Sequence, residues 1–280
     1  MRRALGFLHV PKAAGSSLSD ALRRAALDAG HRVASPVMDA TLFGSFDDFA
    51  AMPAATQAMI ELDPMRLADA DTVVGHYSLA SLRHGRTDGD IVCVLREPRA
   101  RLLSLYTFWR SWTPAQHAAW DPYDSSRRAA HGALDVTLAD PAMAPQVDNV
   151  AARLLLAGDQ RVPADRPIDE ADHGALADEA LARLAALGHV DTVEAGDVGW
   201  SRISAWVGVD LAVDRHNVTP PGAPVDAEDL GAASAAIERY TAIDQRLWRA
   251  AISAHEPHAS GEELRRRSDA AYARQRARVT

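Results

Sequence analysis

Two apolar runs, each followed by a loop and then a helical stretch, constrain the fold of this chain most strongly. The first run, Ala4 to Val10, ends at Pro11 and precedes an amphipathic stretch that closes at Gly30. The second run, Asp90 to Arg96, is almost wholly apolar and precedes the helical stretch 98–112, which begins with proline. An apolar run of this kind is typical of a strand inside a parallel sheet. The alternation therefore predicts a doubly wound α/β fold with helices on both faces of a central parallel sheet.

The rest of the chain extends this pattern and becomes mainly helical. Asp71 to Tyr77 is a further β-type run, interrupted by Gly75-His76, and His189 to Ala195 is expected to form one more strand. The second half carries helical spacing in QVDNVAARLLLAG, ALADEALARLAALG and GDVGWSRISAWVG, and each ends at glycine. A basic stretch over about 260–280 is expected to form a helix or a frayed tail. Since no repeat or low-complexity linker interrupts the chain, we expect one domain over residues 1–280.

Composition excludes several classes of function. The 280 residues carry a formal net charge of −8, which disfavours nucleic acid as a partner and means that an anionic ligand needs a local basic site. A single cysteine, Cys93, excludes an internal disulfide framework. No apolar stretch approaches the ~20 residues of a membrane span, and the opening MRRALGFLHVPK is too short for a signal peptide. We therefore expect a cytoplasmic protein.

The loop in FLHVPKAAGSSL, Phe7 to Leu18, has the composition of an anion site. It differs from the triphosphate loop G-x-x-x-x-G-K-[ST], because Lys12 comes before the only glycine, Gly15. Unpaired amides at a helix start and the helix dipole favour a bound anion. We expect Gly15 to allow close approach of the ligand, and Ser16 or Ser17 to cap the helix. The alternative is an ordinary capped helix with a surface lysine.

A second candidate anion site follows the other central strand, in LREPRARLLSLY. Arg96 stands at the carboxyl end of the predicted strand, where ligands bind in open α/β sheets. Ser104 follows eight residues later, about two turns into the next helix. An arginine and a serine in this relation can converge on one phosphate group. Arg99 and Arg101 are expected to face solvent.

Together, the two motifs resemble the PAPS-dependent sulfotransferases, whose donor is 3′-phosphoadenosine 5′-phosphosulfate. HVPKAAGSSL is similar to the 5′-phosphosulfate loop of the carbohydrate-type branch, which includes the uronosyl 2-O-sulfotransferases and shows H-x-P-K-x-x-G-[ST]-[ST]. LREPRARLLSLY is similar to the 3′-phosphate motif, including the arginine-to-serine spacing. VVGHYSL, VDNVAARLLLAG and ERYTAIDQRLW also look like that branch. One departure is Ala13-Ala14, which replaces a Thr-Gly or Cys-Gly pair, so this stretch is expected to bind through its backbone alone.

The resemblance implies a three-layer, P-loop-type fold, a role for each motif, and sulfuryl transfer to a hydroxyl, with a carbohydrate or glycolipid acceptor expected. His76 is implied as the base that takes the acceptor's proton; the alternative is a core histidine at a strand end, hydrogen-bonded to the backbone. Lys12 is implied as the second catalytic residue, which stabilises the oxygen between phosphorus and sulfur. Arg96 and Ser104 are implied as ligands of the 3′-phosphate. The residues implied at the 5′-phosphosulfate are Lys12, Ala14, Gly15, Ser16, Ser17 and Leu18. His9 is expected to orient the site. Since the transferred group carries one negative charge, no metal ion is expected.

Several alternatives remain open at this level. Asn149 and Arg153 share one helical face and are candidates for acceptor contacts, although a polar rim explains them equally well. A phosphotransferase related to kinases would need an acidic magnesium ligand, which Asp71 or Asp90 offers only loosely. A non-catalytic nucleotide- or glycan-binding module is the other rival. The loop Asn217 to Pro224 is expected at the surface or over the ligand, and the terminal arginines on a solvated face. The sequence does not define the oligomeric state.

Overall fold

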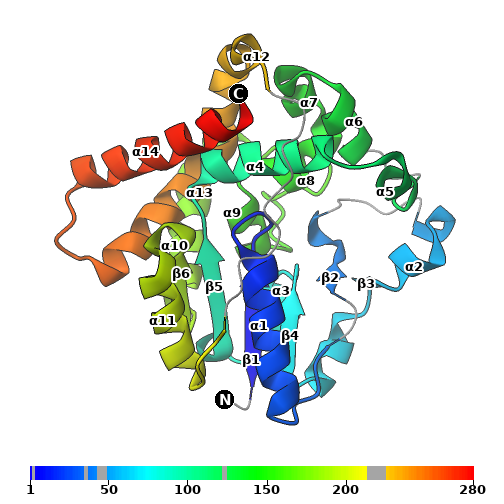
Figure 1. Ribbon diagram of the computed structural model, residues 1–280, viewed down its shortest axis with the longest axis vertical. Coiled ribbons are helices and arrows are strands. Elements are labelled where there is room, and N and C mark those ends of the chain that lie inside the picture. Colours follow the sequence, from blue (N-terminus) through cyan, green and yellow to red (C-terminus); the bar gives the residue numbers. More distant parts are fainter. Residues whose placement is uncertain (2–3, 35–36, 43–48, 122–124, 213–224) are drawn as a thin grey trace.

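The core of the protein is a sheet of four parallel strands with helices on both faces (Figure 1). This computed structural model describes residues 1, 4–34, 37–42, 49–121, 125–212 and 225–280. The strand order is β4-β1-β5-β6, and Phe7 in the central β1 lies opposite Val74 and Val92. The strands are β1 (Leu5–His9), β4 (Thr72–Gly75), β5 (Ile91–Leu95) and β6 (His189–Thr192). The α/β class and the parallel central sheet are thus confirmed.

A small second sheet lies beside this core and pairs β2 (Met38–Asp39) with β3 (Ile60–Glu61). Met38 forms a parallel bridge to His76, so the small sheet borders the carboxyl end of β4. The remaining elements are helices. The longer ones are α1 (Gly15–Asp28), α4 (Pro98–Arg110), α10 (His173–Ala186), α11 (Gly196–Val207), α13 (Ser234–His255) and α14 (Gly261–Val279). The shorter ones are α2 (Ala54–Gln57), α3 (Leu79–Leu82), α5 (Pro114–Ala118), α6 (Ser125–His131), α7 (Leu134–Ala139), α8 (Ala144–Val147), α9 (Val150–Leu155) and α12 (Ala227–Ala232).

Alternating side chains of the central strands divide the core into two layers. Phe7 and Val92 pack on one face against α1 and α11. Leu8 and Cys93 pack on the opposite face with α3, α9, α10 and α13. The burial of both faces is the reason that β1 and β5 are almost wholly apolar. No helix in the described part of the chain is long and apolar enough to cross a membrane.

The start of α1 differs from the expectation. The helix begins at Gly15, and its N-cap is Ala14, which adopts the left-handed conformation (φ 54°) and provides no side-chain cap. The prediction that Ser16 or Ser17 caps the helix is therefore wrong. The turn at Ala14 brings the chain into the helix before either serine, so both serines lie within the first turn.

The C-terminal segment is an ordered part of the core's periphery. Residues 261–279 form α14, which lies across α4 at the carboxyl end of the sheet (Figure 1). Leu264, Ala271 and Val279 of this helix are buried. The inner side of α14 packs short and apolar side chains against α4 and α13. The arginines of α14 are exposed or half-buried, so the expectation that they lie on a solvated face is confirmed.

Candidate active site

The candidate residues converge at the carboxyl edge of the central sheet. The chain passes from β1 outward to β4 and then returns across β1 to form β5 on its other side. The strand order therefore reverses between β1 and β5, and such a switch point opens a crevice beyond the carboxyl ends of the two strands. The Lys12 loop follows β1, and Arg96 follows β5. In Figure 1 the carboxyl ends of β4 and β5 point toward α4.

The two basic motifs contact each other directly. Arg96 donates a hydrogen bond from one terminal guanidinium nitrogen to the main-chain carbonyl of Lys12, at 3.1 Å. The Arg96 charge also helps to lower the pKa of Lys12, next to the larger effect of burial. Two positive side chains this close repel each other, and an anion between them relieves that repulsion. One anionic ligand can therefore contact both motifs.

The backbone of the Lys12 loop is held in an uncommon conformation. Lys12 (φ 65°) and Ala14 (φ 54°) both lie in the left-handed region, which costs a non-glycine residue about 1 kcal/mol. The first turn of α1 contains no acidic residue and receives no side-chain cap from Ala14. Strained loops followed by an uncapped helix start are typical of anion-binding backbone.

The packing around Gly15 gives a steric reason for glycine at this position. A Cβ atom at this position would lie 1.7 Å from Nε2 of His9. The imidazole of His9 thus occupies the space that a side chain at position 15 would need. Close approach of His9 is therefore one reason for glycine at position 15, and close approach of a ligand stays a prediction.

The side chain of Lys12 lies over an aromatic ring at the edge of the site. Its Nζ is 4.1 Å from the centre of the Phe108 ring on α4. Burial, followed by the charge of Arg96, lowers the pKa of Lys12 to about 8. The ammonium form still dominates at pH 7, and its partial desolvation strengthens its attraction for an anion.

Ser104 lies on the face of α4 that is turned toward the Lys12 loop. Phe108 is one turn further along this helix and contacts Lys12, while Arg96, just before the helix, bonds to the Lys12 carbonyl. Residues four apart share a helix face, so Ser104 lies on the side of α4 between these two contacts. Its side chain is largely buried.

The imidazole rings of His76 and His9 contact each other at the ends of two adjacent strands, with their planes tilted by 31°. Their ring centres are 4.0 Å apart, and Nδ1 of His76 is 3.0 Å from the main-chain carbonyl of His9. A carbonyl only accepts, so Nδ1 of His76 carries the proton, and Nε2 of the neutral ring is left with a lone pair. Burial lowers the pKa of His76. The pKa of His9 is lowered well below the ordinary histidine value by burial and by the charges of His76 and Lys12. His9 thus orients the His76 ring as a neutral acceptor.

A network of buried carboxylates lies near Arg96, and the charges of Glu194 and Glu97 act on its guanidinium. Glu97 is fully buried, caps α4 through Oε2, and accepts hydrogen bonds through Oε1 from Gln245 and Ser268. Glu194, after β6, accepts from the main-chain N–H of Glu97 at 3.0 Å, and burial raises its pKa. Sequence reasoning did not find this network, because its members come from separate elements.

Arg99 and Arg101 do not face solvent as predicted. Arg99 donates to Glu97 and to Asp269 of α14, and its side chain is 12% exposed. Arg101 is buried, donates to the carbonyls of Gln146 and Val147, and has its pKa lowered to about 10 by burial. Both arginines point inward because α14 and the segment before α9 cover α4.

Asn149 and Arg153 belong to a buried structural network. Asn149 is wholly buried at the N-cap of α9, and its Oδ1 accepts from the main-chain N–H of Ile243. Arg153 is 3% exposed and pairs with Asp148 at 2.6 Å. Neither side chain forms the polar rim that the helical spacing suggested. Their hydrogen bonds hold α9 to α13 and to neighbouring loops, so we leave both residues out of the candidate site.

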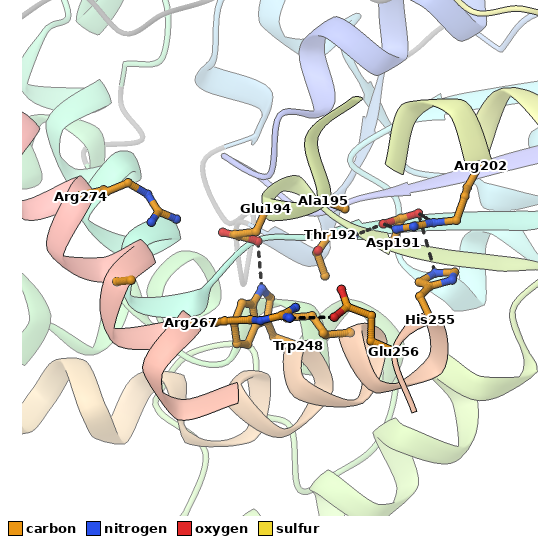
Figure 2. Close-up of a pocket in the computed structure, with 12 residues that line it drawn as sticks. Asp191, Thr192, Glu194, Ala195, Arg202, Trp248, His255, Glu256, Arg267 and Arg274 are labelled. Carbon is orange, nitrogen blue, oxygen red and sulfur yellow. Dashed lines mark hydrogen bonds and ion pairs between the residues drawn. The ribbon is translucent and has the colours of Figure 1, made fainter. Parts of the chain in front are cut away.

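A cavity of about 300 Å³ lies at the carboxyl end of β6, between α11, α13 and α14 (Figure 2). His189, Asp191 and His255 come together beside it, with potential ligand atoms within 4.8 Å of one another. Arg202 binds both oxygens of Asp191, and Nε2 of His255 is 2.7 Å from the Val190 carbonyl, to which it donates. These contacts form an ion-paired network. The charge of Asp191 is already neutralised by Arg202, so the cluster is poorly suited to a metal cation.

The two acidic residues considered as magnesium ligands lie at the other edge of the sheet. Asp71 precedes β4 and accepts hydrogen bonds from Arg32, while Asp90 precedes β5 and binds Thr87.

The predicted loop Asn217 to Pro224 lies outside the described residues. No family model matches the chain, and no curated protein or solved structure gives a significant match.

Proposed function

We propose that this protein is a sulfotransferase that moves a sulfuryl group from PAPS to a hydroxyl group of a carbohydrate acceptor, on a P-loop-type scaffold. The observation that carries the proposal is the hydrogen bond from Arg96 to the Lys12 carbonyl. It joins the two motifs that resemble the 5′-phosphosulfate and 3′-phosphate sites of one donor. A ligand with anionic groups at both ends of one nucleoside suits such a paired site.

The residues of the site fit both ends of this donor. The loop amides and the start of α1, with Ser16 and Ser17 in the first turn, suit the 5′-phosphosulfate. Arg96 has five N–H donors, of which two are used in the described contacts, and Ser104 lies on the adjacent helix face. These two residues suit the 3′-phosphate, which stays on the donor throughout the reaction.

In the proposed sulfuryl transfer, Lys12 acts on the leaving oxygen and His76 acts on the acceptor hydroxyl. As the acceptor oxygen bonds to sulfur, the bond from sulfur to the bridging oxygen breaks, and negative charge grows on that oxygen. The ammonium group of Lys12 stabilises that charge. Nε2 of His76 takes the proton of the acceptor hydroxyl, because the bond from Nδ1 to the His9 carbonyl keeps Nε2 unprotonated.

Calorimetric titration of the full chain tests the donor class directly. Adenosine 3′,5′-bisphosphate should bind at least tenfold more tightly than ATP or GTP, because its two phosphate groups engage both motifs. Transfer of radiolabelled sulfate from PAPS to a panel of oligosaccharides then tests the reaction. Equal or tighter binding of ATP would refute the sulfotransferase and favour a phosphotransferase. Bisphosphate binding without transfer to any hydroxyl acceptor would instead favour a non-catalytic module.

A further inference from the structure

The C-terminal helix reaches the candidate site through one buried side chain. Gln275 of α14 is 7% exposed, and its Oε1 accepts a hydrogen bond of 2.7 Å from the second terminal nitrogen of Arg96. The guanidinium is thus held at two points, by the Lys12 carbonyl and by Gln275. Both partners are oxygen acceptors that fix the plane of the group, and neither neutralises its charge.

The helix that carries Gln275 is itself fastened to α4 next to Arg96. Arg99 donates to Ser268 at 2.7 Å and to Asp269 at 3.0 Å, and Ser268 donates to the buried Glu97 at 2.9 Å. Arg99 also lies over the Tyr272 ring, 4.8 Å from its centre. These contacts fix α14 along one side, so the position of Gln275 relative to Arg96 is determined by packing.

A cation of α14 also acts on Arg96. The charge of Arg278 contributes to the lowered pKa of Arg96, after burial. Arg278 is exposed and follows Gln275 by three residues, so both side chains lie on the same face of α14. The neighbouring positive charges of Arg96 and Arg278 favour a dianionic ligand group over a neutral one.

We propose that α14 makes the site selective for a ligand with a second phosphate group: Gln275 positions the guanidinium of Arg96, and Arg278 adds a further positive charge beside it. This inference rests on the proposed function, since it concerns the 3′-phosphate of the same donor. Residues 261–279 are then part of the binding site and determine its preference for bisphosphorylated over monophosphorylated nucleotides.

The test compares two ligands that differ only in the second phosphate. The full chain is titrated calorimetrically with adenosine 3′,5′-bisphosphate and with adenosine 5′-monophosphate. Gln275→Ala should weaken bisphosphate binding about tenfold, because a guanidinium that loses one of its two supports is no longer held in place. Monophosphate binding should change less than about twofold, a separation that a general loss of stability would not produce.

Two further variants separate positioning from charge. Gln275→Glu keeps an oxygen on Arg96 but places a carboxylate beside the phosphate, so it should weaken bisphosphate binding at least as much as Gln275→Ala. Arg278→Gln should weaken bisphosphate binding about threefold, with a smaller dependence on salt. Arg276→Gln removes the same charge from the same helix but from another face, and should leave both affinities unchanged.

The outcomes distinguish this inference from the function on which it rests. A wild-type protein without preference for the bisphosphate would overturn the proposed function and the role of α14 with it. A selective wild type whose Gln275 variants keep the full preference would overturn the role of α14 alone. The role of α14 would likewise be overturned if the Gln275 variants lose affinity for both ligands equally, since that pattern marks a purely structural contact.

Discussion

Arg96 donates a hydrogen bond of 3.1 Å to the main-chain carbonyl of Lys12, although 84 residues separate them in the chain. The bond connects the loop after β1 to the end of β5. A change at either residue should therefore alter the binding of both phosphate-bearing ends of the proposed donor. It also uses the carbonyl of a residue in the left-handed conformation, which the contact helps to hold.

Arg96→Lys tests this link. A lysine keeps the charge but cannot bond to Lys12, Gln275 and a phosphate in one plane. We expect the affinity for adenosine 3′,5′-bisphosphate to fall about tenfold or more, measured by calorimetry. Arg32→Lys, at the opposite edge of the sheet, serves as the matched control and should bind normally. Unchanged affinity in Arg96→Lys would show that only the charge at this position matters.

His76→Ala tests the base. We expect turnover of PAPS to fall about 10²–10³-fold, while the affinity for the bisphosphate changes little, because His76 contacts the acceptor and not the donor in the proposed reaction. Single-turnover sulfate transfer and calorimetry on the same preparation separate the two effects. Near-normal turnover would remove His76 from the mechanism.

Gly15→Ala and His9→Ala should show a non-additive relation. The new methyl group in Gly15→Ala collides with the His9 ring, which must move and take His76 with it. We expect turnover to fall about a hundredfold in Gly15→Ala, but only about tenfold in His9→Ala, where the carbonyl that bonds to His76 remains. The double variant should match His9→Ala, because the collision is gone. Multiplied losses in the double variant would contradict the proposed contact.

The pH dependence of kcat/KM should be bell-shaped. Burial lowers the pKa of His76, so the acidic limb should lie below the ordinary histidine value of about 6.5, with activity lost as pH falls through it. The pKa of Lys12 is about 8, so activity should be lost again as pH rises through 8. Lys12→Arg keeps its positive charge at high pH, so its profile should lack the alkaline limb, even if its maximal kcat/KM is lower than that of the wild type. An alkaline limb that stays at pH 8 in this variant would assign it to another group.

Arg153→Ala should affect stability and not the site. Removing it leaves Asp148 buried without its partner, a change that typically lowers the free energy of unfolding by about 3–5 kcal/mol. Denaturant unfolding measures this loss, and bisphosphate affinity at low temperature should stay normal. Arg266→Ala, in an exposed pair with Glu262, is the control and should change stability by less than about 1 kcal/mol. A specific loss of acceptor activity in a stable Arg153→Ala protein would restore its role in the site.

Many local elements of this protein were predictable from the sequence, but β2, β3 and α13 were not predicted. The apolar runs gave β1, β4 and β5 almost at their observed bounds, and helical spacing gave α1, α4, α10 and α11. These features depend on neighbours within a few residues, since a helix or strand period is repeated over short distances. The start of α1 was predicted wrongly, because the helix begins after a left-handed turn at Ala14 and not at a capping side chain.

The sequence by itself determined the strands of the central sheet, many of the helices, and which residue types follow the strand ends. The tertiary structure decided what those residues contact. The order β4-β1-β5-β6 brings His76, Lys12 and Arg96 to one edge, and α14 returns Gln275 to Arg96 across 179 residues of chain. Helical spacing shows that Asn149 and Arg153 lie close together, but not that α13 and the loop around Asp148 enclose them. Periodicity specifies the face of an element, whereas its partner is selected by packing between segments far apart in the chain.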